Sequence, residues 1–280
     1  MKTAPVNKII PFSNVDGPGN RTSIFFQGCP FNCLFCHNPE TIHMCRNCGA
    51  CVAGCPVGAL SADGGGAVRW DGARCVGCDA CIRACPHDAS PRIRWMTVAD
   101  VLREVRRSAP YIGGITTSGG ECTLRSDFLT ELISEVRKLG KTCLIDSNGS
   151  FDFEGDPALL AVCDGVMLDV KATAPDWSRE LVGCAPDMVL KNLDYLLRVR
   201  KLQEVRTVIF PGRDGDNEAT VRYVAARIGD ACDYKIIRYR PFGVRERYQK
   251  LLGEDTTDAG YAESYARLAR ELGAARAFVV

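Results

Sequence analysis

Three cysteines near the start of the chain have a spacing that could hold an iron–sulfur cluster. Cys29, Cys33 and Cys36 form a C-x3-C-x2-C run. A [4Fe-4S] cube has four irons, so three thiolates leave one iron without a protein ligand. An open metal position is typical of catalytic centres, whereas a closed one is structural or only transfers electrons. The run therefore predicts chemistry carried out at a cluster.

Two other interpretations of this run fit less well. Zinc sites favour paired C-x2-C elements, and a disulfide-rich knot would be a small secreted protein. This chain has 280 residues and sixteen cysteines, and its first residues lack the apolar stretch of a signal peptide. We therefore expect a cytoplasmic protein whose thiols stay reduced and serve as metal ligands. Because an open cluster is sensitive to oxygen, we expect an anaerobic setting.

The overall composition excludes some classes of function. Hydrophobic residues make up 46% and charged residues 25% of the chain, with a net charge of +1. These values are ordinary for a globular protein and give no electrostatic footprint for nucleic acid. No stretch approaches the roughly 18 consecutive apolar residues of a membrane span. The expected partners therefore include neither nucleic acid nor membrane.

A second cysteine pattern occurs twice, thirty residues apart. Residues 45–56 and 75–86 both read C-x2-C-x2-C-x3-C-P, the run of bacterial ferredoxins, in which the fourth cysteine ligates the other cluster. Each cluster would be fully ligated, which favours electron transfer; the alternative is that the clusters only stabilise a segment with little core. The expected ligand sets are Cys45, Cys48, Cys51 and Cys85 for one cube, and Cys75, Cys78, Cys81 and Cys55 for the other.

Helices and strands alternate after these runs. Thr97 and Asp100 resemble a capping box at the start of a helix. We expect strands at 22–27, 113–117, 142–147, 165–170, 204–210 and 234–239, and helices at 124–139, 157–162, 187–200, 217–229 and 258–272. Such alternation indicates a parallel sheet covered by helices. Six strand–helix units fall short of the eight that close a full barrel.

Polar residues follow several of the expected strands. In parallel barrels the functional residues lie at the carboxyl ends of strands. The segments at those ends are Ser-Gly-Gly-Glu at 118–121, Asp-Ser-Asn-Gly at 146–149, Met-Leu-Asp-Val-Lys at 167–171, and the strand that contains Arg206. Carboxylate and hydroxyl oxygens suit a hard cation, and an arginine suits a carboxylate. Taken singly, the turn at 146–149 and Lys171 also fit a plain turn and a solvated charge.

Essentially the whole chain resembles a known family, most clearly near its start. Residues 15–21 (Val-Asp-Gly-Pro-Gly-Asn-Arg), 25–29 and 33–38 resemble the start of the radical S-adenosylmethionine (SAM) enzymes that activate glycyl radical enzymes. With the double ferredoxin run, the chain is most similar to the YjjW-type branch. The resemblance implies a partial (β/α)6 barrel at 1–42 and 93–280, with a ferredoxin-like double-cluster domain inserted at 43–92.

The resemblance also implies an activity. The open iron would chelate SAM, one electron would cleave it, and the 5′-deoxyadenosyl radical would take hydrogen from a backbone glycine of a partner glycyl radical enzyme. The cofactors would be three [4Fe-4S] clusters, SAM and a monovalent cation. A low-potential donor such as flavodoxin or ferredoxin would supply the electron.

The family's site residues carry over to positions of this sequence. Those implied to contact SAM are Asn38, Gly119, Gly120, Glu121, Asp146, Ser147, Asp169, Lys171, Arg206 and Arg240. Those implied to hold the cation are Asp146, Ser147, Asp169 and the carbonyl of Met167. Two positions depart from the family: Cys122 stands where proline is usual, and Arg240 stands where some relatives have histidine.

Two other functions compete with this one. A radical SAM enzyme acting on a small molecule or peptide would need a buried polar pocket instead of an open cleft. A pure electron carrier would leave the open iron of Cys29, Cys33 and Cys36 unused and would not cleave SAM. Formation of 5′-deoxyadenosine from reductant and SAM distinguishes the carrier from the enzymes.

Overall fold

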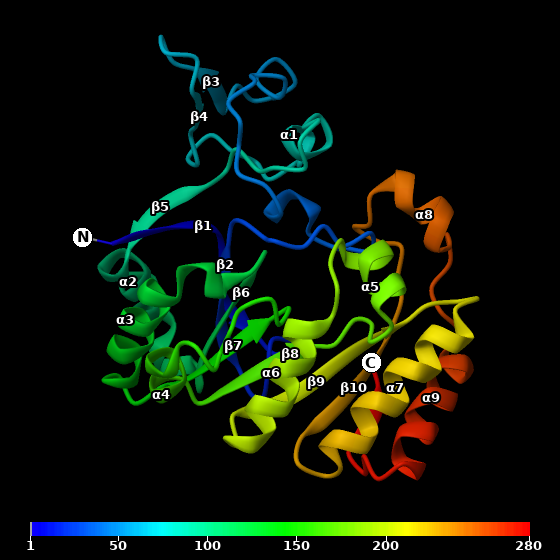
Figure 1. Cartoon of the computed structure of the whole chain (residues 1–280). Helices are drawn as coiled ribbons and strands as arrows, with labels where there is room; N and C mark the ends of the chain where they lie inside the picture. Colours follow the sequence, from blue (N-terminus) through cyan, green and yellow to red (C-terminus); the bar gives the residue numbers. More distant parts are fainter. Residues whose placement is uncertain (1) are drawn as a thin grey trace.

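A nine-stranded sheet forms the frame of the protein (Figure 1). The computed structural model describes residues 2–280; Met1, at which the first expected barrel segment begins, lies outside them. The strand order is β11-β10-β9-β8-β7-β6-β2-β1-β5. The strands are β1 (Thr3–Ser13), β2 (Arg21–Phe26), β5 (Arg94–Thr97), β6 (Gly114–Gly119), β7 (Thr142–Ser147), β8 (Gly165–Asp169), β9 (Leu202–Ile209), β10 (Asp233–Arg238) and β11 (Ala277–Val279).

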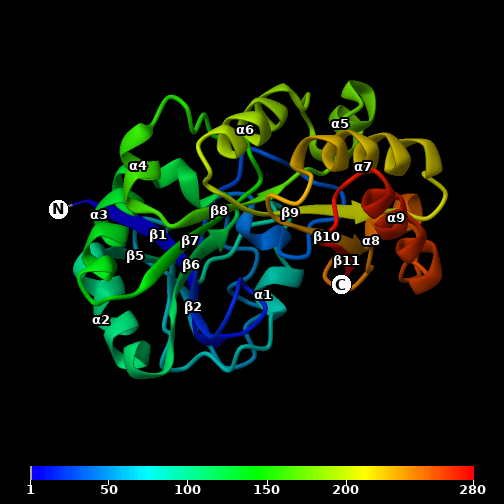
Figure 2. The same cartoon turned by 90° about the horizontal axis from the view of Figure 1, so that it is seen from below.

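Helices follow the strands and cover the outer face of the curved sheet (Figure 2). The α-helices outside residues 43–92 are α2 (Val98–Ser108), α3 (Ser126–Arg137), α4 (Pro157–Val162), α5 (Pro175–Val182), α6 (Asp187–Arg198), α7 (Asp214–Ile228), α8 (Glu246–Leu252) and α9 (Ala259–Glu271). Short 3-10 turns are η1 (Pro39–Thr41), η2 (Ala109–Tyr111) and η3 (Cys122–Arg125). Among residues 2–280, no helix has the length and hydropathy needed to traverse a bilayer.

Six neighbouring strands, from β2 to β10, are parallel. The sheet does not close: β1 pairs antiparallel with β2, β5 pairs antiparallel with β1, and β11 adds a parallel strand at the other edge. The mixed α/β fold with a partly parallel sheet is therefore confirmed. β1, β5 and β11 were not expected, and they extend the sheet beyond the six predicted strands.

The predicted capping box at the start of α2 is present. The hydroxyl of Thr97 accepts from the backbone N–H of Asp100 at 3.2 Å, and the Asp100 carboxylate accepts from the Thr97 N–H at 3.0 Å. These bonds satisfy two groups that a helix start leaves without partners. The helix then buries Val98, Val101 and Val105 on one side, as their helical spacing requires.

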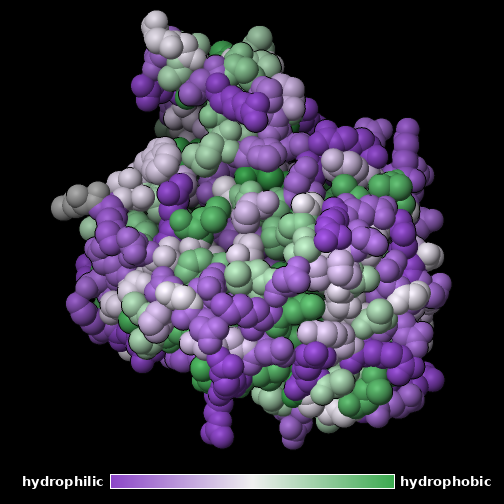
Figure 3. Space-filling model, viewed as in Figure 1, coloured by the Kyte–Doolittle hydropathy of each residue, from purple (hydrophilic) through white to green (hydrophobic). Residues whose placement is uncertain are grey.

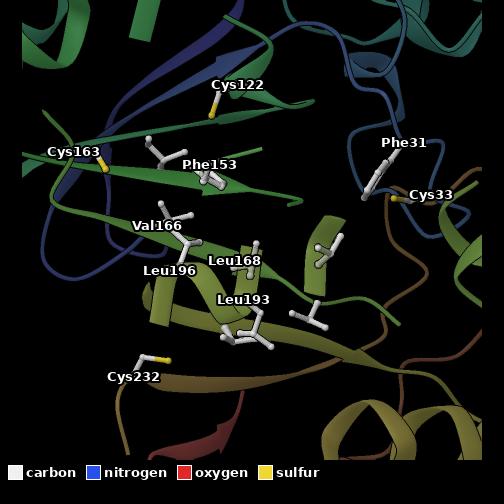
Figure 4. Packing of buried hydrophobic residues seen from close by; sticks show 14 of the residues in the cluster. Phe31, Cys33, Cys122, Phe153, Cys163, Val166, Leu168, Leu193, Leu196 and Cys232 are labelled. Atoms are coloured by element: carbon white, nitrogen blue, oxygen red, sulfur yellow. The ribbon is translucent and has the colours of Figure 1, made fainter. Parts of the chain in front are cut away.

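The core lies between the sheet and its helices. Figure 4 shows Leu193 and Leu196 of α6 facing Val166 and Leu168 of β8, and all four side chains are fully buried. Apolar burial of this kind contributes about 25 cal/mol per Å² of buried surface. This packing holds the parallel strands in place, and the carboxyl ends of β2 and β6–β10 lie along one rim of the sheet.

Residues 43–92 leave the barrel after η1 and return with β5. Figure 3 shows them as a separate lobe whose surface mixes hydrophilic and hydrophobic residues. The lobe contains the antiparallel pair β3 (Leu60–Ala62) and β4 (Val68–Trp70) and the one-turn helix α1 (Ala80–Arg83). Its buried apolar cluster contains only Cys51, Leu60 and Cys81, with five partly buried neighbours. So small a core is insufficient for an independent fold.

Candidate active site

A cavity of about 380 Å³ opens at the carboxyl ends of the parallel strands. This volume lies within the range of roughly 300–1,000 Å³ that is usual for small-molecule sites. Most of the predicted site residues line it together, namely Cys29, Cys33, Cys36, Asn38, Gly119, Gly120, Asp146, Ser147, Asp169, Lys171 and Arg206. Glu121, Met167 and Arg240 do not.

The cysteine loop follows β2 and is anchored at both ends. The N–H of Cys29 donates to the carbonyl of Ile42 at 2.9 Å, and the N–H of Leu34 donates to the carbonyl of Leu181 at 2.9 Å. Burial raises the pKa of Cys29 well above its ordinary value and that of Cys33 to about 12. The thiols therefore stay protonated until a metal displaces their protons.

Asn148 donates its side-chain amide to Sγ of Cys29 at 3.3 Å. The sequence placed Asn148 only in a turn after β7, so this contact was missed. Donors to a cluster sulfur tune its potential. The position of Asn148 could have indicated this contact, because Asn148 directly follows two predicted site residues at the end of a strand.

Arg206 is the centre of a buried polar network. Its Nη1 donates to Asp146 at 2.9 Å, and its Nε donates to Glu204 at 2.5 Å. Glu204 also pairs with Lys235 at 2.8 Å. Burial alone would lower the pKa of Arg206, but the carboxylates of Asp146, Asp169 and Glu204 together outweigh it and raise the pKa above its ordinary value. The guanidinium therefore stays charged on the cavity wall.

Lys171 supplies a second cation. Its Nζ pairs with Asp169 on β8, and its ammonium lies 5.9 Å from the ring centroid of Phe35. Burial opposes the charge of Lys171, but Asp169, Cys33 and Asp146 together raise its pKa above the ordinary value. Lys171 and Arg206 thus hold the two carboxylates that the sequence assigned to a monovalent cation, and that assignment stays a prediction.

The two glycines after β6 are required by packing. Gly119 has φ +115°, and a Cβ there would lie 2.3 Å from the backbone of Phe26. A Cβ on Gly120 would lie 2.3 Å from the carbonyl oxygen of Gly28 and 2.8 Å from that of Thr41. Real side chains do not fit at such separations, so only glycine lets the end of β6 cross the cysteine loop.

Glu121 does not face the cavity. Its carboxylate accepts from the N–H and hydroxyl of Thr123 at 3.2 and 2.6 Å, from the Ser147 hydroxyl at 3.1 Å, and from the Asn148 N–H at 2.7 Å. These donors take up its acceptor positions. Sequence reasoning expected this carboxylate to meet the ammonium of SAM, whereas here it holds together the loops after β6 and β7.

Arg240 and Met167 also lie away from the cavity. Arg240 is exposed, and its carbonyl lies 3.1 Å from Nε2 of His37. Arg238, two residues earlier, lines the cavity instead, because β10 ends there. Met167 is buried below Arg206, which donates from Nη2 to its Sδ at 3.3 Å.

Sequence reasoning did not select several other residues of the cavity wall. They are Asp16, Phe25, Phe35, His37, Thr41, Ile42, Ser118, Asn148, Val208, Ile237 and Arg238. Val208 lies two residues after Arg206 on β9, so the period of two in a strand could have identified it. Ile237 comes near the end of β10, where only the fold shows which residues turn inward.

The eight cysteines of the lobe gather in two groups that combine both ferredoxin runs. One hollow is lined by Cys45, Cys48, Cys51 and Cys85, and the other by Cys55, Cys75, Cys78 and Cys81. The grouping matches the expected ligand sets. Burial opposes ionisation at Cys51, whereas backbone N–H groups lower the pKa of Cys55, that of Val57 most strongly.

The backbone repeats as well. Asn47 and Gly77 have φ of +57° and +70°, Gly49 and Asp79 have +74° and +57°, and Gly58 and Asp88 have +60° and +49°. Each pair is thirty residues apart. Left-handed residues of this kind turn backbone N–H groups into concave nests that bind anions. The two runs therefore share one loop conformation that suits an anionic cluster.

Within residues 2–280, no three or more His, Cys, Asp or Glu side chains close around a single metal ion. Cysteine thiolates are the ligands of iron–sulfur cubes, and each thiolate of a cube binds a different iron.

Comparisons with known proteins indicate the family to which the chain belongs. A family model described as the radical SAM superfamily matches residues 23–224. The choline trimethylamine-lyase activating enzyme of Oleidesulfovibrio alaskensis is 30% identical, over 96% of this chain and 94% of that protein. The benzylsuccinate synthase activating enzyme of Thauera aromatica is 32% identical, over 82% and 75%. The solved structure of QueE from Escherichia coli shares the fold, with a TM-score of 0.50 and 14% identity over 91% of this chain and 94% of that one.

The chain therefore belongs to the radical SAM superfamily. Within it, the chain is a glycyl-radical-enzyme activating enzyme. It uses a [4Fe-4S] cluster and SAM, and it abstracts hydrogen from a backbone glycine of a partner glycyl radical enzyme. The predicted activity is confirmed, and a pure electron carrier is excluded.

Proposed function

We propose that Cys29, Cys33 and Cys36 ligate the cluster whose fourth iron binds SAM. The observation that carries this assignment is a single cavity lined by three cysteine thiols and by the cationic side chains of Lys171 and Arg206. When bound, the reduced cluster supplies the electron that cleaves SAM. The thiols fix the cluster at the rim, and the two cations attract the carboxylate of SAM through charge-assisted hydrogen bonds.

The protein's own side chains prepare this cavity. Asp146 and Glu204 hold the Arg206 guanidinium from two sides, so it keeps one orientation before SAM arrives. Glu121 fixes the loop that carries Asn148, and Asn148 contacts Cys29. Preorganised groups of this kind lower the cost of ordering the site on binding.

We further propose that residues 43–92 form a ferredoxin-like domain with two more [4Fe-4S] clusters, inserted between barrel segments 1–42 and 93–280. Support comes from the two hollows, each lined by four cysteines, and from the loop conformation shared by both runs. Since both sets are complete, these clusters relay electrons from a low-potential flavodoxin or ferredoxin. The sixteen cysteines favour a reducing, anaerobic cytoplasm as the setting.

Iron analysis and targeted substitution test the relay. Three cubes give about twelve irons per chain. We expect Cys48→Ser with Cys78→Ser to reduce the iron content and to abolish 5′-deoxyadenosine formation driven by flavodoxin. Cys184→Ser is a matched control, because Cys184 belongs to none of the three sets. The relay is wrong if the double variant loses both lobe clusters and still turns over normally with flavodoxin.

A further inference from the structure

Arg245 joins three parts of the chain that are distant in sequence. It lies directly before α8, and its side chain is 7% exposed. Nη1 donates to the Asp88 carboxylate at 2.6 Å, and Nη2 donates to the Cys33 carbonyl at 3.0 Å and to the Asn32 side-chain oxygen at 2.9 Å. One guanidinium therefore bonds the lobe and the cysteine loop at the same time.

Asp88 lies at the neck where the chain enters and leaves the lobe. Its carbonyl accepts from the N–H of His43 at 3.4 Å, and His43 forms a β-bridge with Ala89. Its carboxylate also accepts from Arg247 at 2.8 Å. Asp88 follows Cys85 by three residues, so a displacement of Asp88 displaces a ligand of the first lobe cluster.

The segment that carries Arg245 is itself packed against the cysteine loop. A Cβ on Gly243 would lie 2.6 Å from the carbonyl oxygen of His37, so the two backbones are in contact. The guanidinium of Arg245 lies 4.6 Å from the ring centroid of Tyr248. Contacts on both sides leave Arg245 little freedom to adopt another conformation. Its planar fork suits this double role, which a lysine cannot perform.

We propose that Arg245 is a positioning residue for electron transfer, which fixes the lobe cluster of Cys45, Cys48, Cys51 and Cys85 relative to the open cluster. This inference rests on the proposed relay function of the lobe. A reduced flavodoxin loses one electron, the lobe clusters accept it and pass it on, and the open cluster is reduced; no bond is broken in these steps. Because the rate of electron tunnelling falls steeply with distance, a lobe that moves on its neck would deliver electrons more slowly.

The test compares two reductants in the fully cluster-loaded protein. In Arg245→Gln, we expect SAM cleavage driven by reduced flavodoxin to fall about tenfold or more, as misplaced groups do. Cleavage driven by photoreduced deazaflavin, a small reductant that reaches the open cluster through the cavity, should change less than about twofold in Asp88→Asn, and in Arg245→Gln it should fall less than the flavodoxin-driven rate. Asp88→Asn weakens the same link from the lobe side and leaves the contact between Arg245 and Cys33 in place. Arg69→Gln is the matched control, because Arg69 pairs with Asp63 inside the lobe.

Hydrogen exchange supplies a readout that does not depend on activity. Peptides that contain His43 and residues 86–92 should exchange about tenfold faster in Arg245→Gln and Asp88→Asn, since local opening becomes easier. Peptides from β3 and β4 should not change. An equal loss with both reductants, or unchanged exchange at the neck, would overturn the proposal.

Failure of the relay gives a different pattern. In that case the double variant Cys48→Ser with Cys78→Ser would cleave SAM normally with flavodoxin although Arg245 and Asp88 are intact. If the lobe clusters are required but Arg245→Gln and Asp88→Asn keep full flavodoxin-driven turnover, the relay stands and the role of Arg245 is wrong.

Discussion

Asn148 and Cys29, which are 119 residues apart in the sequence, meet through a hydrogen bond from Nδ2 to Sγ of 3.3 Å. The contact joins the loop after β7 to the loop after β2. Glu121 stabilises the position of Asn148, since its carboxylate accepts from the Asn148 N–H at 2.7 Å. A buried carboxylate therefore holds the loop that places a side-chain amide donor on this sulfur.

Replacing Asn148 should shift the potential of the open cluster. A donor to a ligand sulfur stabilises the reduced, more negative cluster, so Asn148→Ala should make the potential more negative. A redox titration followed by electron paramagnetic resonance measures the shift. Asn7→Ala removes an amide that donates to Gln27 and not to a cysteine sulfur, and it serves as the control. An unchanged or more positive potential in Asn148→Ala would contradict the role assigned here.

Arg206→Lys should weaken SAM binding. Lysine keeps the charge but lacks the fork that contacts Asp146 and Glu204 together. Loss of a charge-assisted hydrogen bond costs about 1.5–3 kcal/mol, which corresponds to a rise in Kd of roughly ten- to a hundredfold. Equilibrium binding of SAM to the oxidised enzyme measures this change in Kd. Arg222→Lys, in an exposed pair with Glu218, should leave Kd unchanged, and the assignment fails if both variants bind SAM as the parent does.

Features that depend only on the spacing of nearby residues could be predicted from the sequence. Cysteine runs specify their ligand chemistry within a few residues, and the Thr97 cap needs only Asp100. β1 was missed because Pro5 and Pro11 within it argue against a strand. Long-range contacts were missed for a different reason: the bonds from Asn148 to Cys29 and from Arg245 to Asp88 depend on how distant segments pack.

The same limit explains where the arrangement of the site differs from the expected one. Arg240 was selected because it stands where some relatives have a histidine, whereas β10 ends at Arg238 and Arg238 lines the cavity. Glu121 follows β6 as expected, but its carboxylate is turned away from the cavity. Its orientation follows from the donors of Thr123, Ser147 and Asn148, which only the fold brings together.

Gly120→Ala should disrupt the site. The new Cβ would lie 2.3 Å from the Gly28 carbonyl oxygen, and backbone cannot yield as a flexible side chain does. Forcing the chains apart costs about 1–3 kcal/mol, so thermal stability and SAM affinity should both fall. Gly64→Ala is the control, because nothing lies within 4 Å of a Cβ there. Equal thermal stability and SAM affinity in both variants would show that the β6 loop is not packed as described.

Buried thiols outside the clusters should make stability fall at alkaline pH. Burial raises the pKa of Cys163 to about 11 and that of Cys232 to about 12. Above the ordinary thiol pKa of about 9 the unfolded chain releases protons that the folded chain keeps, so the free energy of unfolding decreases as pH rises. The decrease approaches about 1.4 kcal/mol per thiol per pH unit.

Urea unfolding under reducing, anaerobic conditions at pH 8, 9 and 10 measures this slope. Cys232→Ala should lower stability at pH 8 through a lost contact and flatten the decrease at higher pH. Cys184→Ala should leave the slope closer to that of the parent. The same slope in Cys232→Ala and the parent would contradict the assignment.

The most direct test of the central claim is electron–nuclear double resonance on the reduced enzyme with SAM labelled with ¹⁷O in its carboxylate and ¹⁵N in its amino group. If Cys29, Cys33 and Cys36 leave one iron open for SAM, both labels will couple strongly to the cluster, and Cys33→Ala will abolish the signal. Absence of coupling in the enzyme that still cleaves SAM would contradict this account of the site.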